Sequence, residues 1–133
     1  MHDGVVDDEA TATVEFRVTQ SDTAIALMSG DLPVLATPRL IAWLEAATCE
    51  AARPRLATGQ TTVGTRVVVD HESPSAVGAS VIAIARLSAV HERTLTFDVA
   101  ASDAETGRSL AHGVVTRVVV DEQRFMARLT RDS

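Results

Sequence analysis

Glu45 is the side chain in this sequence whose surroundings most favour chemistry. It belongs to a stripe at helical i, i+3/i+4 spacing that consists of Ile41, Glu45, Thr48 and Ala52. A carboxylate in a face that is otherwise fairly apolar is costly unless it has a partner, which makes Glu45 the first candidate for chemistry. The alternative is that the helix is only partly covered and that Glu45 points to water, as we expect for Glu50.

His71 and Thr37 are the next candidates. His71 ends a run of valines before a turn, where an imidazole could face a cleft; a structural or exposed histidine is the alternative. Thr37 is also a good helix N-cap, with Pro38 at the first helical position. Thr37 and Glu45 are eight residues apart, which is about 12 Å along a helix axis. A shared site therefore requires a helix that begins later, or a contribution from each of two chains.

Gly64 and Arg117 are weaker candidates for the same site. A glycine within a strand lets a ligand or another chain approach the backbone closely. Arg117 is a candidate for a buried ion pair or for phosphate binding, because a guanidinium binds phosphate through two parallel hydrogen bonds. We expect His91 to be exposed in a turn, and His112, inside a strand, is weaker still. Cys49 is the only cysteine and is expected to pack in the core; no Cys/His spacing predicts a metal site.

One helix and five strands are predicted to position these residues. The helix spans Thr37–Ala52, and Pro54 ends it. The connection before it, residues 20–35, has the length of a functional lid and contains a predicted helical turn at Thr23–Met28. The predicted strands are Thr11–Thr19, Thr61–Glu72, Ala79–Val90, Thr94–Ser102 and Arg108–Asp121, with a helical turn or strand over Glu122–Leu129.

Short turns join the last four strands, which implies antiparallel neighbours. Such a sheet has a face to cover, and the single long helix is available to cover it. The predicted fold class is therefore α+β: a curved antiparallel sheet of about five strands around one long central helix. We expect a single domain over residues 1–133, with a loosely ordered lead-in at residues 1–9. An isolated protomer leaves a sheet edge and helix surface uncovered, so a homodimer is expected, and pairing into tetramers is left open.

Composition excludes several classes of protein. The chain is 46% apolar and 23% charged, which is typical of a soluble globular domain. Its net charge of −6 argues against binding to nucleic acid, and no apolar run is long enough to span a bilayer. No signal peptide is visible, so we expect a cytoplasmic protein with neither membrane nor nucleic acid as a partner. All twelve basic residues are arginine, which together with many Ala and Val residues favours a GC-rich, bacterial genome.

Taken together, short motifs of this chain resemble the hotdog-fold acyl-CoA thioesterases of the fluoroacetyl-CoA thioesterase-like family. The resemblance extends from about residue 10 to residue 129 and rests on Ala36-Thr37, Leu44-Glu45, Val63-Gly64-Thr65, Val69-Asp70-His71 and the segment from Arg117 through Arg124-Phe125. Each motif is short, but their order and spacing agree together. The spacing of Thr37, Glu45 and His71 agrees with that of the family's catalytic threonine, glutamate and histidine.

The resemblance implies hydrolysis of an acyl-CoA thioester to the free acid and CoA, in a homodimer and without a cofactor other than the CoA of the substrate. By position, Glu45 would be the nucleophile or general base, and Thr37 would orient it or the substrate. His71 would transfer protons. The backbone N–H of Gly64 would stabilise the carbonyl oxygen, and Arg117 corresponds to the family's arginine near the site.

The lid segment departs from the family's namesake, which uses aromatic lid side chains to sense fluorine and exclude water. The stretch Met28–Pro33 contains no aromatic residue. Fluoroacetyl specificity is therefore not expected, and both the acyl group and the thiol carrier, CoA or a carrier protein, stay open. The rival hypothesis is a catalytically silent acyl-CoA or small-ligand binding protein on the same fold. A hydratase or dehydratase with an Asp70-His71 pair is a third, although adjacent strand residues point to opposite faces.

Overall fold

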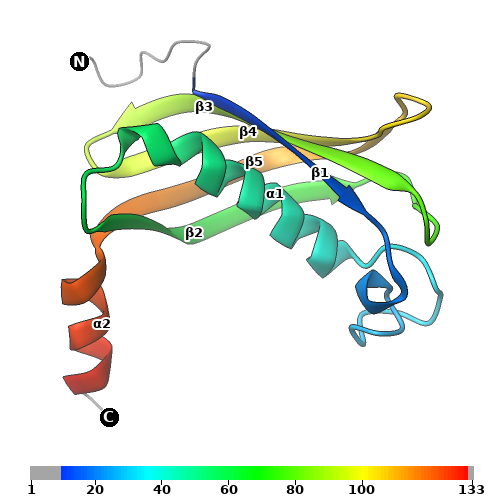
Figure 1. Ribbon diagram of the computed structural model, residues 1–133, viewed down its shortest axis with the longest axis horizontal. Coiled ribbons are helices and arrows are strands. Elements are labelled where there is room, and N and C mark those ends of the chain that lie inside the picture. Colours follow the sequence, from blue (N-terminus) through cyan, green and yellow to red (C-terminus); the bar gives the residue numbers. More distant parts are fainter. Residues whose placement is uncertain (1–9, 132–133) are drawn as a thin grey trace.

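The computed structural model describes residues 10–131; the lead-in predicted at residues 1–9 lies outside them. One antiparallel sheet is crossed on one face by the helix α1 (Thr37–Ala52), as Figure 1 shows. Its strands are β1 (Thr11–Arg17), β2 (Gln60–His71), β3 (Ser80–His91), β4 (Thr94–Asp103) and β5 (Ser109–Asp121). A second helix, α2 (Glu122–Arg131), follows β5 and projects from one end of the sheet. The predicted α+β class is confirmed.

The strand order is β1-β3-β4-β5-β2, so the two strands that flank α1 in sequence form the opposite edges of the sheet. β2 pairs with β5 along its whole length, with Gln60 opposite Asp121 and His71 opposite Ala111. The register shifts between Gly64 and Arg66, which makes a β-bulge in this edge strand. The other edge of β2 has no neighbouring strand among the described residues.

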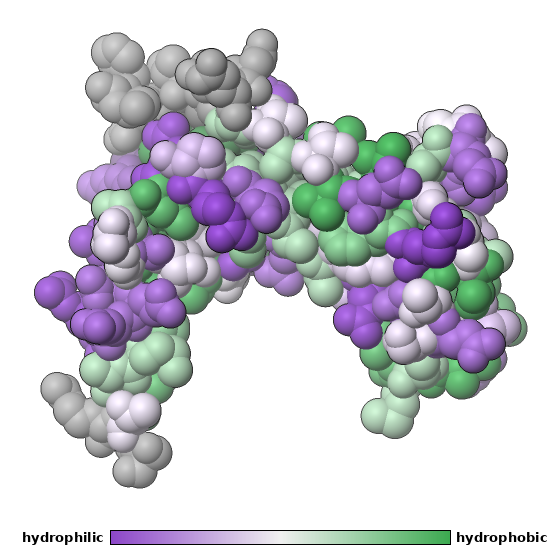
Figure 2. Space-filling view, viewed as in Figure 1, coloured by the Kyte–Doolittle hydropathy of each residue, from purple (hydrophilic) through white to green (hydrophobic). Residues whose placement is uncertain are grey.

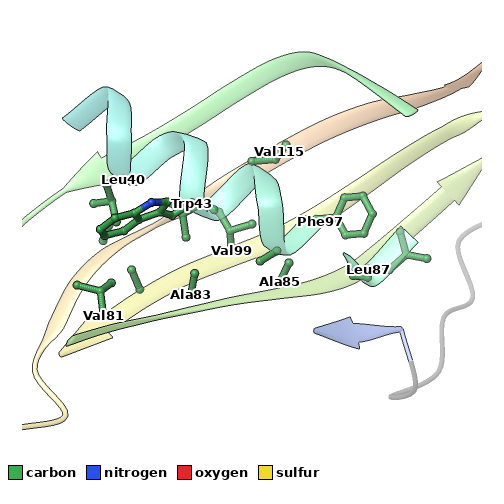
Figure 3. Close-up of a cluster of buried hydrophobic side chains, with 14 of the residues drawn as sticks. Leu40, Trp43, Val81, Ala83, Ala85, Leu87, Phe97, Val99 and Val115 are labelled. Atoms are coloured by element: carbon green, nitrogen blue, oxygen red, sulfur yellow. The ribbon is translucent and has the colours of Figure 1, made fainter. Parts of the chain in front are cut away.

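The core lies between α1 and the sheet. Leu40, Leu44 and Ala47 of α1 are fully buried, and Figure 3 shows Leu40 and Trp43 above the strands. The small residues Ala83 and Ala85 of β3 lie beneath the helix and are buried. Side chains without bulk at these positions let the helix approach the sheet closely. This packing fixes the direction in which the remaining faces of α1 point.

The start of α1 differs from the prediction in one respect. The N-cap position is Ala36, and Thr37 and Pro38 are the first two helical residues. The prediction that Thr37 caps the helix is therefore wrong: the helix has no side-chain cap, and the hydroxyl of Thr37 has another partner. The other end agrees with the prediction, because α1 stops at Ala52 and a 3₁₀ turn containing Pro54 follows.

The segment between β1 and α1 also differs from the prediction. A turn lies where one was predicted, with the Leu27 N–H donating to the Thr23 carbonyl at 3.0 Å, but the 3₁₀ helix η1 (Gln20–Asp22) precedes it and was not predicted. The cause is Asp22, whose carboxylate accepts hydrogen bonds from both the N–H and the hydroxyl of Thr19, each at 2.8 Å. At the other end of the chain, the predicted tail over Glu122–Leu129 is the helix α2, two residues longer than predicted.

Candidate active site

The start of α1 and the end of β2 bring Thr37 and His71 together. Thr37 Oγ1 lies 2.8 Å from His71 Nδ1, a hydrogen bond between residues 34 positions apart in the chain. Thr37 is available for this bond because it occupies the first turn of α1 without capping it. Of the three predicted catalytic residues, the structure thus places two in direct contact.

The imidazole of His71 is half-buried, and this burial is the main influence on its charge. Desolvation lowers the pKa of His71 below its usual value and outweighs a backbone hydrogen bond with Ser73 that raises it. The neutral ring is therefore favoured near pH 7. Its Nε2 atom is buried and has no hydrogen-bond partner among the described residues. A buried polar atom without a partner marks a place where an ordered water molecule would bind.

A cavity of about 250 Å³ opens beside this pair. Its walls come from the segment before α1, from the start of α1 and from the end of β2 with the turn after it. The lining residues are Ala24, Ser29, Val34, Leu35, Thr37, His71, Glu72, Ser73 and Pro74. The wall is part apolar and part polar, as expected where an acyl group would meet reacting groups.

Glu45, in the middle of α1, is held by a buried arginine of β5. Arg117 Nη1 lies 3.2 Å from Glu45 Oε2, and the Arg117 side chain is only 8% exposed against 34% for Glu45. Two further hydrogen bonds fix the guanidinium: Nε donates to Thr62 Oγ1 at 2.8 Å and Nη2 to the Thr62 carbonyl at 3.2 Å. Of the two roles expected for Arg117, a buried ion pair and phosphate binding, this contact is the ion pair.

Gly64 lies directly under the same carboxylate. A Cβ atom at this position would be 2.6 Å from Glu45 Oε2 and 3.3 Å from Arg117 Nη1. Any other residue would displace the carboxylate, so the glycine is needed for close packing rather than for an unusual backbone conformation. Glu45 is therefore not simply solvated: α1, β2 and β5 together position its carboxylate.

The predicted residues form two separate groups within one chain. Thr37 and His71 make one, and Glu45, Gly64 and Arg117 make the other. Along α1 the groups are separated by about 12 Å. Along β2, the seven residues from Gly64 to His71 span about 23 Å. Because α1 begins at Thr37, a later helix start does not bring them together.

The remaining candidates lie elsewhere. His112 Nδ1 is 2.9 Å from Glu72 Oε1, and the carboxylate of Asp70 is 77% exposed on this outer face of the sheet, away from His71. Cys49 is half-buried in α1. His91 is exposed at the end of β3, before the β3–β4 turn. None of these joins the two groups described above.

Sequence reasoning missed Thr62, which holds Arg117 through two atoms. Its only signal is that it precedes Gly64 by two residues, on the same face of the strand. Within residues 10–131, no cluster of His, Cys, Asp or Glu could hold a metal ion. Over the same residues, no helix is both long and apolar enough to cross a membrane.

Comparisons with known proteins identify the family. A family model described as fluoroacetyl-CoA-specific thioesterase matches residues 18–123. The solved structure of the fluoroacetyl-CoA thioesterase FlK superposes with a TM-score of 0.86 at 26% identity, covering 92% of this chain and 94% of that one. A hypothetical protein of Thermus thermophilus from the thioesterase superfamily gives 0.84 at 24% identity, covering 91% and 88%. A 1,4-dihydroxy-2-naphthoyl-CoA thioesterase from Synechocystis gives 0.68 at 17% identity, covering 84% and 82%.

The family match covers most of the chain, including Thr37, Glu45, Gly64, His71 and Arg117. The two structures below 25% identity support the fold alone. A comparison with curated protein sequences finds no match. The resemblance seen in the sequence motifs is confirmed: the chain belongs to the fluoroacetyl-CoA-specific thioesterase family, and it is an acyl-CoA thioesterase with the hotdog fold.

Proposed function

We propose that this enzyme hydrolyses a small- or medium-chain acyl-CoA with Glu45, Thr37 and His71 as catalytic residues, in a site shared by two protomers. The observation that carries the proposal is the position of the Glu45 carboxylate. One oxygen is fixed by Arg117 above Gly64, and the other, Oε1, has no hydrogen-bond partner among the described residues. A carboxylate oriented in this way can take a proton from water or attack a carbonyl carbon itself.

The proposed reaction adds water across the C–S bond of the thioester. With Glu45 as general base, the water oxygen bonds to the carbonyl carbon while the carboxylate takes its proton. The N–H of Gly64 stabilises the oxyanion that forms. When the hydroxyl of Thr37 donates to Nδ1 of His71, the ring proton is on Nε2. His71 gives that proton to the CoA sulfur as the C–S bond breaks, and recovers one from Glu45.

The route with Glu45 as nucleophile differs only in its first half. The carboxylate forms a mixed anhydride with the acyl group and expels CoA, and water then hydrolyses the anhydride. The balanced products, free acid and CoA, are the same. Incorporation of solvent ¹⁸O into Glu45 during turnover would demonstrate the anhydride route with attack of water at the glutamyl carbonyl. Attack at the acyl carbonyl labels the acid instead, so rapid-quench detection of an acylated Glu45 separates the two routes in that case.

The homodimer is part of the proposal because the two groups of residues are too far apart in one chain. A two-fold axis that pairs β2 with its copy would make the two strands antiparallel. The last residues of one β2 would then lie opposite the first residues of the other. Gly64 is the fifth of twelve residues in β2 and His71 is the last, so the partner subunit's His71 would come closer to Glu45 than His71 of the same chain.

The shape of the protomer supports this arrangement. β2 is an edge strand of twelve residues, and among the described residues no strand pairs with its outer side. Val68 of this strand is half exposed. Figure 2 shows the molecule hollowed beneath this edge, between the end that carries α2 and the end that carries residues 20–35. An exposed edge strand of this length is a template for pairing with another chain.

Release of free thiol from a panel of acyl-CoAs tests the activity. We expect Glu45→Gln, which keeps size and removes the charge, to lower kcat by about a hundredfold or more, in the range of a general base. Thr37→Ser should retain more activity than Thr37→Ala. Absence of thiol release with every substrate would contradict the proposed hydrolysis. Wild-type rates in Glu45→Gln would exclude its catalytic role.

Mixing two inactive variants tests the shared site. Glu45→Ala and His71→Ala protomers are combined, dissociated and allowed to reassociate. If each site takes Glu45 from one chain and His71 from the other, about a quarter of the sites in a random mixture regain both residues. If both residues come from one chain, the mixture stays inactive. The same variants unmixed are the control.

A further inference from the structure

Three arginines face one small hollow at the end of the sheet, away from the residues discussed so far. The hollow has a volume of about 90 Å³ and lies between the β3–β4 turn and α2. It is lined by Arg93, Val120, Asp121, Arg124, Phe125 and Arg128. The hollow is large enough for a phosphate group.

The backbone fixes the elements that carry these arginines. The Arg93 carbonyl accepts a hydrogen bond from Val119 N–H at 2.9 Å, which ties the β3–β4 turn to β5. α2 begins with Arg124 N–H donating to Asp121 Oδ1 at 2.9 Å. Arg124 and Arg128 are four residues apart, so they share one side of α2. The three side chains thus start from anchored positions around the hollow.

The charges of these three arginines are not compensated by ion pairs, as is also true of Arg17, Arg55, Arg66 and Arg108 among the described residues. Arg39, Arg53, Arg86 and Arg117 each lie within an ion-pair distance of a carboxylate. Among the described residues, no carboxylate lies within that distance of Arg93, Arg124 or Arg128. The one acid in the lining, Asp121, accepts a backbone hydrogen bond from α2. Three like charges gathered in a chain of net charge −6 repel one another unless an anion lies between them.

We propose that the hollow lined by Arg93, Arg124 and Arg128 binds a phosphate group of the CoA nucleotide. This inference rests on the proposed acyl-CoA substrate. Guanidinium groups suit the role because they bind phosphate oxygens through two parallel hydrogen bonds.

The position also fits the length of a CoA molecule. Asp121 is four residues beyond Arg117 on β5, about 13 Å farther along the strand. The phosphates would therefore lie beyond Glu45 by a length that the pantetheine arm can span. The hollow is at the end of the sheet opposite to His71 of the same chain, because Asp121 pairs with Gln60 and Ala111 with His71. In the proposed dimer, that end is where the partner subunit's His71 would lie.

Kinetics with two thioesters test the proposal. Acetyl-CoA is compared with S-acetylpantetheine, which has the same thioester and no nucleotide. For Arg124→Gln and Arg128→Gln we expect KM for acetyl-CoA to rise about tenfold each at unchanged kcat, as for a charged hydrogen bond. The kcat/KM for S-acetylpantetheine should not change. Arg86→Gln, at an exposed arginine of β3 away from the β2 edge, is the matched control and should behave as wild type with both substrates.

A binding measurement separates failure of this inference from failure of the proposed hydrolysis. Calorimetric titration with CoA, 3′-dephospho-CoA and pantetheine needs no turnover. Weaker CoA binding in the Arg124 and Arg128 variants, with pantetheine binding unchanged, supports the site even if no thioester is hydrolysed. Dephospho-CoA distinguishes the 3′-phosphate from the diphosphate.

Two results would overturn the inference. One is a fall in kcat/KM that is equal for acetyl-CoA and S-acetylpantetheine, or no fall in kcat/KM for either thioester. The other is a defect confined to acyl groups on an acidic carrier protein, which would assign the arginines to docking of that protein. We expect the Arg124 and Arg128 variants to unfold at an unchanged Tm, because the arginines are exposed. An unchanged Tm would exclude a general folding defect.

Discussion

At the scale of single residues, the unusual feature is an ion pair in which only one partner is buried. Arg117 is almost fully covered and Glu45 is one-third exposed. The cost of burying the guanidinium is offset by three hydrogen bonds, two of them to Thr62. Arg117 therefore orients the carboxylate from below and leaves its upper side open. This assigns Thr62 a positioning role that acts through Arg117.

Thr62→Val is the substitution that tests this role. It preserves shape but removes the acceptor of the Arg117 Nε–H, so we expect a loss of about 1–3 kcal/mol in the free energy of unfolding. We also expect kcat to fall about tenfold with little change in KM, because Glu45 is less well oriented. Thr62→Ser keeps the acceptor and should restore kcat. A valine variant with wild-type kcat would exclude the positioning role.

His71 predicts a dependence of stability on pH. Its pKa is lowered in the folded protein, so below its ordinary pKa of 6.5 the unfolded chain binds a proton that the folded chain does not. The free energy of unfolding should therefore fall as the pH decreases from about 6.5 toward the lowered pKa. Urea unfolding at several pH values measures this. His71→Gln should flatten the slope in this window; a slope that stays as in the wild type would contradict the assignment.

At the scale of the elements, α1 carries residues of both groups, but no side chain caps its N-terminus. Ala36 provides no cap, and the hydroxyl of Thr37 is bonded to His71 across to β2. The position of the helix is fixed by packing instead, through buried residues such as Leu40 and Leu44 and the stacking of Trp43 on Phe16 at a centroid distance of 4.7 Å.

Thr37→Ala should therefore affect activity far more than stability. Because no cap hydrogen bond is lost, the free energy of unfolding should fall by less than about 0.5 kcal/mol, below the usual cost of removing an N-cap. Activity should fall because His71 loses the partner that fixes its tautomer. Chemical denaturation and thiol release, measured on one preparation, check both. A stability loss typical of a cap, about 1 kcal/mol or more, would contradict this account.

The elements were largely predictable from the sequence, and the contacts between them were not. Alternation and turn residues predicted all five strands and α1 to within a few residues. Thr37 followed by Pro38 reads the same whether Thr37 caps the helix or opens it, so the cap prediction failed. Nothing in Thr61-Thr62 distinguishes the residue that bonds Arg117. That distinction exists only once β2 has paired with β5 in one register.

At the scale of the whole molecule, β2 is the feature that calls for a second copy. Val68→Lys would place a charged side chain in this edge strand, a substitution that disfavours pairing with another chain. We expect the dimer dissociation constant to rise by at least about tenfold, and specific activity to fall on dilution. Sedimentation velocity and thiol release over a concentration series measure both effects.

A matched control for this variant is available in the neighbouring strand. Val114 of β5 pairs with Val68 and is similarly exposed on the same face, but it is not at an edge. Val114→Lys should leave the dimer intact. Equal dissociation of both variants would place the interface on the sheet face rather than at the β2 edge.

The strand order has a consequence for how the enzyme is made. Glu45 and Arg117 are 72 residues apart in the chain, and β2 can pair only with β5, the last strand to be synthesised. Contacts between such distant residues form late, because the intervening chain must first be ordered. A nascent chain on the ribosome therefore carries α1 and β2 without this partner strand until β5 has emerged. Formation of the Glu45–Arg117 ion pair and closure of the sheet are then one folding event, and a truncated chain ending before β5 would have neither.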